Sequence, residues 1–94
     1  MQDGYSFEWD KHKAEANLKK HGVSFEEGIT VFGDPLSMNM RDPDHSQSEE
    51  RYIVLGLSER YRLLVVCYAE VKERTRIISA RQATRSERKN YEEK

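Results

Sequence analysis

The hydrophobic and polar positions of the first third of the chain follow a helical period. Residues 11–20 are mainly helix formers, and they follow Asp10, a residue type that commonly caps the start of a helix. Over residues 25–32, apolar side chains recur at the i, i+3, i+4 and i+7 positions of one helix face. The pattern therefore predicts two helices near the N-terminus, the second opened by a capping box that begins at Ser24.

The centre of the chain has the period of β-strands. Apolar and polar residues alternate over residues 36–40, which predicts a half-buried strand. Residues 52–57 and 63–68 are continuous apolar runs, typical of central strands, and residues 74–80 form a fourth candidate strand. Short connections between consecutive strands indicate an antiparallel meander.

Two further segments complete the expected order. Residues 7–9 alternate as a short edge strand does, and a capping box at Thr84 and Glu87 predicts a C-terminal helix through about Glu92. The expected fold class is α+β, with two N-terminal helices, an antiparallel sheet of about four strands and a C-terminal helix, the helices lying against one face of the sheet. No repeat or linker interrupts residues 1–94, so we expect a single domain.

Composition then excludes several classes of protein. The single cysteine, Cys67, excludes an internal disulfide and a cysteine-based zinc site. The longest apolar run, residues 63–69, is far shorter than the roughly 20 residues that span a bilayer. The first residues lack the basic and apolar regions of a signal peptide. We therefore expect a small cytoplasmic domain without a membrane partner.

The formal net charge of −1 conceals a difference between the two halves of the chain. Residues 1–50 carry five Lys/Arg against eleven Asp/Glu, a net charge of −6, whereas residues 51–94 carry eleven against six, a net charge of +5. A basic half suits a nucleic-acid partner. It is equally compatible with mutual neutralisation of the halves in the fold, or with a solvated helix face.

The cations of the second half concentrate on the last predicted strand and helix. Cations near tyrosines suit contacts to phosphates and bases, although a docking site for an acidic partner has the same composition. Alternation along the strand predicts that Arg74, Arg76, Ile78 and Ala80 share one sheet face while Thr75, Ile77, Ser79 and Arg81 share the other. The basic set comprises Arg74, Arg76, Arg81, Arg85, Arg88 and Lys89.

No motif for a cofactor or a metal is present. The chain has no phosphate-binding glycine loop and no zinc-peptidase motif, and its histidines share no ligand spacing. Asp42, Asp44 and His45 crowd one loop, but turn-forming Asp-Pro loops are common. Phosphate chemistry without a metal would be RNA cleavage by the RNA's own 2′-hydroxyl. That reaction needs a general base, a cation for the charge on phosphorus and an acid for the leaving oxygen.

Four stretches of the sequence point to a known family. They are F-E-W-D-x-x-K-A-x-x-N-L-x-K-H-G-V-S-F-E-E over residues 7–27, V-F-x-D-P over 31–35, D-H-S-x-x-E-E-R-Y over 44–52, and R-I-I-S-A-R-x-A-x-x-x-E-R-x-x-Y over 76–91. In these stretches the chain resembles the BrnT toxins of bacterial type II toxin–antitoxin systems, from about Tyr5 to Glu92.

The resemblance implies a fold similar to the RelE-like ribonucleases and an endoribonuclease that cleaves RNA and arrests translation and growth. It implies a BrnA-like ribbon-helix-helix antitoxin as partner, and operator DNA bound only through the complex of toxin and antitoxin. The positions that match the family motifs imply catalytic roles for Arg81, Glu87, Arg88, Tyr91 and, in the third stretch, His45. Arg51 lies in the same stretch as His45 and is expected to bind RNA together with Arg74, Arg76, Arg85 and Lys89.

Structural alternatives stay open at these positions. Glu87 is also the capping-box glutamate, His45 could order its loop, and Tyr91 could serve in packing. The alternative function is a non-catalytic module whose basic face binds a nucleic acid or an acidic protein.

Overall fold

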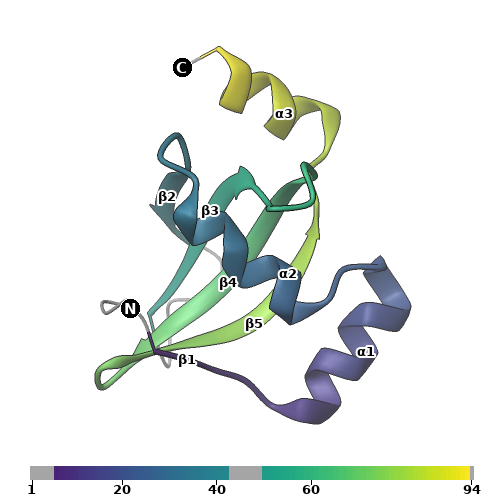
Figure 1. Cartoon of the computed structure of the whole chain (residues 1–94). Coiled ribbons are helices and arrows are strands. Elements are labelled where there is room, and N and C mark those ends of the chain that lie inside the picture. Colours follow the sequence, from purple (N-terminus) through teal and green to yellow (C-terminus); the bar gives the residue numbers. More distant parts are fainter. Residues whose placement is uncertain (1–5, 43–49, 94) are drawn as a thin grey trace.

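The computed structural model describes residues 6–42 and 50–93. None of the helices in these two ranges is long and apolar enough to cross a membrane. The elements, in chain order, are β1 (Phe7–Glu8), α1 (Lys11–His21), α2 (Phe25–Ile29), the 3-10 helix η1 (Thr30–Gly33), β2 (Met38–Arg41), β3 (Arg51–Leu57), β4 (Leu63–Val71), β5 (Arg74–Gln82) and α3 (Arg85–Glu92) (Figure 1).

The helix boundaries follow the predicted caps. The side chain of Asp10 accepts a hydrogen bond from the backbone N–H of His12 at 3.1 Å, and Gly22 ends α1 in the left-handed region at φ +69°. The hydroxyl of Ser24 accepts from the backbone N–H of Glu27 at 3.0 Å at the start of α2. At α3 the predicted reciprocal capping box is present between Thr84 and Glu87.

The sheet confirms the predicted meander and corrects the strand count. Its order is β1-β5-β4-β3-β2, and β2 to β5 pair antiparallel in sequence. The edge strand expected over residues 7–9 is present as β1, but it is a fifth strand and runs parallel to β5, so the expected antiparallel sheet of about four strands was wrong in count and in this pairing. The sequence could not reveal the pairing, because the partner of β1 lies 68 positions away.

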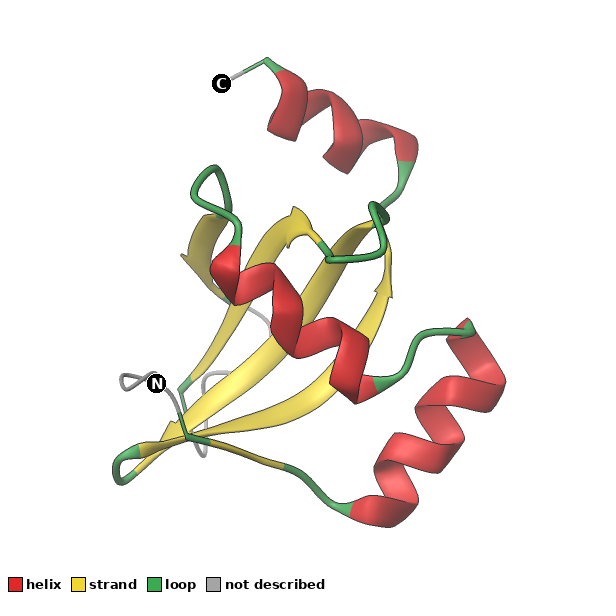
Figure 2. Ribbon diagram, in the orientation of Figure 1, coloured by secondary structure: helices red, strands yellow, loops and turns green. Residues whose placement is uncertain are grey.

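The helices do not all lie against one face of the sheet as expected, because α3 lies beyond one end of it. In Figure 2, α2 and η1 lie across one face of the sheet and α1 lies beside β5; Phe25, Leu64, Val66 and Ile77 belong to the core beneath α2. Helix α3 lies beyond one end of the sheet, and its Tyr91 packs against a second, smaller apolar cluster. That cluster exists because β3 and β4 are apolar on both faces; its buried members are Leu55, Leu63 and Val65.

A β-bulge in β5 changes which residues share a face. Tyr68 opposes Ile77 and the preceding Cys67 opposes Ser79, so Ile78 is an extra residue without a partner. The predicted alternation was therefore wrong beyond Ile77. Ile77 and Ala80 both belong to the helix-covered core although they are three residues apart. Arg74, Arg76, Ser79 and Arg81 consequently share the face opposite α1 and α2, which we call the second face.

A buried side-chain amide holds α1 to β5. Asn17 donates to the backbone oxygens of Val23 at 2.9 Å and Ala80 at 2.8 Å. It also accepts from the N–H of Ala80 at 3.1 Å. Beside Ala80 there is no β1 residue, because β1 pairs only with residues 75 and 76. Asn17 therefore satisfies the outer backbone groups of β5 where the neighbouring strand has ended.

A second contact, a charged network around Glu27, holds α2 in place. Glu27 is buried, and it accepts hydrogen bonds from Ser58 at 2.8 Å and from Arg62 through both of its carboxylate oxygens. The hydrogen bonds from Arg62 hold the pKa of the Glu27 carboxyl below its ordinary value, against the opposing effect of burial. The network joins α2 to the connection between β3 and β4.

The Asn17 contact predicts a large loss of stability on truncation. In Asn17→Ala the N–H and the C=O of Ala80 lose their partner while they stay buried, so we expect the free energy of unfolding to fall by about 3 kcal/mol. Chemical denaturation measures this difference. The exposed Asn90→Ala on α3 is the matched control and should change stability by less than about 0.5 kcal/mol. A similar small change for Asn17→Ala would contradict the role of the amide.

Candidate functional site

Four of the predicted arginines, Arg51, Arg74, Arg76 and Arg81, lie on the second face of the sheet. Arg76 and Arg51 oppose Ala69 from its two sides, so these two arginines occupy one row across β5, β4 and β3. Two strand spacings separate their backbones by about 10 Å. Arg81 opposes Val65, four residues before Ala69 on β4, and therefore lies about 14 Å along the strand from Arg76. The sheet thus places Arg51 beside Arg76 and not beside Arg81.

Small side chains lie between these arginines. Cys67 and Ser79 oppose each other in the next row, beside Ala69. We call the region formed by Cys67, Ala69, Ser79 and the surrounding Arg51, Arg76 and Arg81 the arginine face. A floor of small residues allows a ligand to approach the sheet closely, and arginine binds phosphate oxygens with two parallel hydrogen bonds.

At one end of the arginine face, Glu8 orients two guanidinium groups. Its carboxylate accepts from Arg74 Nη1 at 3.2 Å and from Arg76 Nε at 3.0 Å. The hydrogen bond from Arg74, followed by the one from Arg76, lowers the pKa of Glu8. The side chain of Arg76 stays 45% exposed, so it can contact a ligand while Glu8 holds it. The sequence did not identify Glu8, because its partners lie more than 60 residues away.

At the other end, Arg81 and Glu87 form a two-pronged ion pair. Both terminal nitrogens of Arg81 donate to the Glu87 carboxylate at 2.9 Å, and the N–H of Thr84 donates to the same carboxylate at 2.8 Å. The hydrogen bonds from Arg81 are the main reason that the pKa of Glu87 falls to about 2, and the same contact raises the pKa of Arg81. Glu87 is therefore ionised at neutral pH and links β5 to α3.

Tyr91 is held by a carboxylate that the sequence did not single out. Its hydroxyl donates to Asp34 Oδ2 at 2.6 Å, and the N–H of Leu57 donates to the same oxygen at 2.8 Å. The hydrogen bond to Asp34 raises the pKa of Tyr91 to about 12, so the phenol keeps its proton throughout the neutral range. Asp34 was visible in the sequence only as a turn residue before Pro35 and as part of the V-F-x-D-P stretch, with no role assigned to it.

The remaining predicted residues are distributed around this face. Arg85, Arg88 and Lys89 are exposed on α3, and Arg88 lies 3.9 Å from Glu92 on the same helix. His45 lies outside the described residues, so its predicted role stays a prediction. Within residues 6–42 and 50–93, no three His, Cys, Asp or Glu side chains gather as metal ligands do.

Asp42 is a further buried carboxylate at this site. It is 6% exposed, and the thiol of Cys67 donates to its Oδ2 across 3.9 Å. Its backbone N–H donates to the carbonyl of Arg51 at 2.8 Å, which fixes it at the edge of the arginine face. In the sequence Asp42 was visible only as one of several loop carboxylates.

The ion pair of Arg81 and Glu87 predicts a dependence of stability on pH. The folded pKa of Glu87 is about 2, below its ordinary 4.5, so the pair stabilises the fold above pH 4.5 and loses this effect as the pH falls to 2. Because Arg81 is 38% exposed, we expect only about 1–2 kcal/mol. Glu87→Gln should therefore be less stable than the unmodified protein at pH 7 and equally stable near pH 2, as measured by denaturant unfolding.

The exposed pair on α3 provides the control for this measurement. Glu92→Gln removes a carboxylate that lies 3.9 Å from Arg88 and is 61% exposed, so its effect should be small at every pH. A difference between Glu87→Gln and the unmodified protein that persists unchanged at pH 2 would show that the charge of Glu87 is not responsible.

Comparison with a solved structure supports the fold. The chain is similar to the 1.1 Å crystal structure of the Brucella abortus ribonuclease toxin BrnT, with a TM-score of 0.63 and 20% sequence identity over 86% of this chain and 99% of that one. At this identity the likeness concerns the fold alone. No protein with a curated description matches the chain.

Comparison with protein families identifies the chain. Residues 9–87 match the family described as "Ribonuclease toxin, BrnT, of type II toxin-antitoxin system". The match covers most of the chain, including α1, the whole sheet beyond β1 and the first residues of α3. It confirms the resemblance seen in the sequence motifs. The chain therefore belongs to the BrnT family of ribonuclease toxins of type II toxin–antitoxin systems.

Proposed function

We propose that this protein is a metal-independent endoribonuclease toxin that cleaves RNA on the arginine face and thereby inhibits translation and growth. The observation that carries the proposal is the arrangement of Arg51, Arg76 and Arg81 around a floor of small side chains, in a chain that belongs to a family of ribonuclease toxins. Permanently charged guanidinium groups suit both the binding of phosphates and the stabilisation of charge that develops on phosphorus.

In the proposed reaction the RNA's 2′-oxygen attacks the adjacent phosphorus and the bond to the 5′-oxygen breaks. Arg81 and Arg88 hold the scissile phosphate, and Arg51, Arg74, Arg76, Arg85 and Lys89 contact the flanking strand. Glu87 or His45 takes the proton of the 2′-hydroxyl as general base. The other of these two residues, or Tyr91 as an auxiliary donor, protonates the leaving 5′-oxygen.

The ion pair of Arg81 and Glu87 supports a coupling between the binding of a phosphate by Arg81 and the basicity of the Glu87 carboxylate. In the free protein the carboxylate is a weak base, since its pKa is about 2. A phosphate that takes the terminal nitrogens of Arg81 removes the hydrogen bonds that lower this pKa most. The basicity of Glu87 then rises beside the bound phosphate, where a proton must be removed.

The proposed partner is a BrnA-like ribbon-helix-helix antitoxin, which neutralises the toxin in the cytoplasm. Within the complex of toxin and antitoxin, it is the antitoxin that contacts operator DNA. Its support is the membership of the chain in a type II toxin–antitoxin family. The similarity to RelE-like ribonucleases, which the sequence resemblance implies, stays a prediction.

Cleavage of RNA in the presence of EDTA tests the reaction. The purified protein should cut an RNA oligonucleotide with EDTA present and leave 2′,3′-cyclic phosphate or 3′-phosphate ends. An oligonucleotide with a single 2′-deoxy residue at the cut position should stay intact, because it lacks the attacking oxygen. Loss of activity in EDTA, or equal cleavage of the deoxy substrate, would contradict the mechanism. Tight binding of RNA without any cleavage would support the alternative, a non-catalytic binding module.

Substitution of Arg81 tests the assignment of the phosphate contact. Arg81→Ala should reduce kcat/KM for RNA cleavage by about 10²-fold or more, since a charge-stabilising donor of this kind contributes that much to catalysis. Arg60→Ala is the matched control, because Arg60 is an exposed arginine of the connection between β3 and β4 whose charge acts on Glu27 of α2 and which is not part of the arginine face. A folded Arg81→Ala protein with undiminished activity would remove Arg81 from the site.

A further inference from the structure

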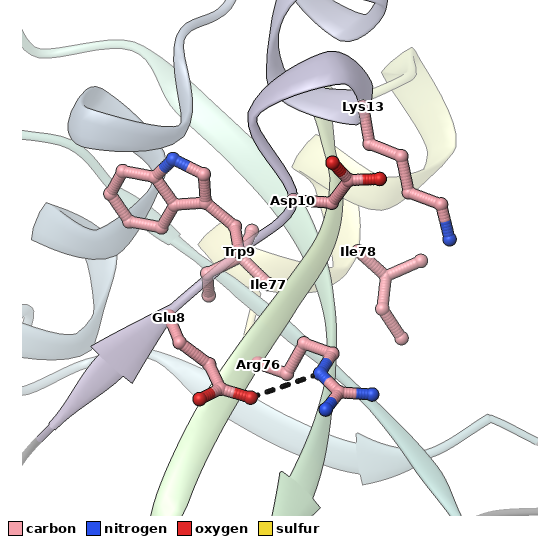
Figure 3. A pocket seen from close by; sticks show the side chains of 7 residues that line it. All are labelled: Glu8, Trp9, Asp10, Lys13, Arg76, Ile77 and Ile78. Carbon is pink, nitrogen blue, oxygen red and sulfur yellow. Dashed lines mark hydrogen bonds and ion pairs between the residues drawn. The ribbon is translucent and has the colours of Figure 1, made fainter.

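A hollow lies between β1, the start of α1 and β5, beside the arginine face. Its volume is about 430 Å³, and Figure 3 shows the side chains around it. The lining residues are Glu8, Trp9, Asp10, Lys13, Arg76, Ile77 and Ile78. Arg76 belongs both to this hollow and to the arginine face, so the two neighbouring regions share one cation.

Two cations, Lys13 of α1 and Arg76 of β5, line the hollow, and each has N–H donors that no described residue accepts. Glu8 accepts from Nε of Arg76, and the terminal nitrogens of Arg76 lie on the side away from Glu8 (Figure 3). These terminal nitrogens make no hydrogen bond within the described part of the chain, which leaves four N–H donors. Lys13 is exposed and forms no ion pair with any described residue.

The hydrogen bonds between Asn17 of α1 and Ala80 of β5 determine where Lys13 lies. Lys13 and Asn17 are four residues apart and therefore share one helix face. Since Asn17 is bonded to Ala80 of β5, Lys13 lies one helical turn further along the same strand, toward Ile78. In Figure 3 the side chain of Lys13 extends toward Ile78.

Ile78 contributes an apolar surface to the hollow. It is the unpaired residue of the β-bulge and is half-buried, in a strand whose other apolar residues face the core. A bulge redirects a side chain at the edge of a sheet, and here it presents an isoleucine between the two cations. An apolar surface of this kind can pack against a ribose or the face of a base.

The charges around the hollow favour one nucleotide unit over a bare anion. Glu8 is neutralised by Arg74 and Arg76, and Asp10 uses one carboxylate oxygen to cap α1 at the N–H of His12. The second oxygen of Asp10 makes no hydrogen bond to a described residue and can accept from the amino group of a base. The hollow therefore offers cationic donors, one acceptor and an apolar wall.

We propose that this hollow is a nucleotide subsite of the toxin, which binds a nucleotide flanking the cleaved bond. Its phosphate lies between Lys13 and Arg76, and its ribose and base pack on Ile78. The subsite rests on the proposed ribonuclease function, because its ligand is the RNA strand that the arginine face holds. A second hollow of about 660 Å³ shares Glu8 and Arg76 and continues the path toward the β4–β5 turn.

Binding of an uncleavable RNA tests the subsite. A 2′-O-methyl RNA oligonucleotide labelled with a fluorophore can bind but lacks the attacking hydroxyl. Lys13→Ala should weaken its binding about fivefold at moderate salt and should reduce the slope of log K against log salt by about 0.7, the value for one phosphate contact on a single strand. Lys13→Arg keeps the charge and should retain the slope of the unmodified protein.

Lys19→Ala is the matched control. Lys19 is exposed on the same helix and lines a different hollow, together with His12 and Leu18, so its removal should leave the slope unchanged. If Lys13→Ala and Lys19→Ala change affinity and slope equally, the subsite is wrong even when the unmodified protein cleaves RNA. If the unmodified protein neither binds nor cleaves RNA, the proposed function itself fails.

Discussion

The arrangement of this fold depends on one side-chain amide at the edge of β5. Because β1 accompanies β5 for only two residues, the outer backbone groups at Ala80 would otherwise be buried without partners. Asn17 supplies both a donor and an acceptor there and so replaces a residue of a neighbouring strand. The same contact sets the rotation and height of α1 against the sheet, which places Lys13 beside the bulge. Core stability and the shape of the surface hollow therefore have a common origin.

Local signals made the helices and the meander predictable. The caps at Asp10, Ser24 and Thr84 act within three residues of the chain, so the sequence displays both partners of each contact. The pairing of β1 with β5 and the extra residue at Ile78 depend on contacts between distant segments, and alternation alone could not reveal either. The position of α3 was missed for a related reason: apolar runs on β3 and β4 indicate burial on both faces but not which element covers each.

The candidate site was predictable by residue type and much less by arrangement. The basic strand and helix were visible in the sequence, and the family motifs drew attention to Arg81, Glu87 and Tyr91. The sequence did not show which groups these side chains contact: Tyr91 donates to Asp34, and Glu8 accepts from Arg74 and Arg76, each across more than 50 positions. Glu87 illustrates the difference, since a capping glutamate and an ion-paired glutamate look alike in sequence, and one side chain here has both roles.

The bulge in β5 has a consequence for how this strand can vary. Residues before and after Ile78 are half a period out of phase, yet the arginines of both segments point to the same side of the sheet. Removing Ile78 would leave Ile77 and Ser79 as neighbours opposite Tyr68 and Cys67, which is the regular pairing of two antiparallel strands, so the arginines on both sides would keep their face. The strand can therefore lose this one residue without turning its arginines into the core, whereas a further loss would move the residues on one side of it to the opposite face.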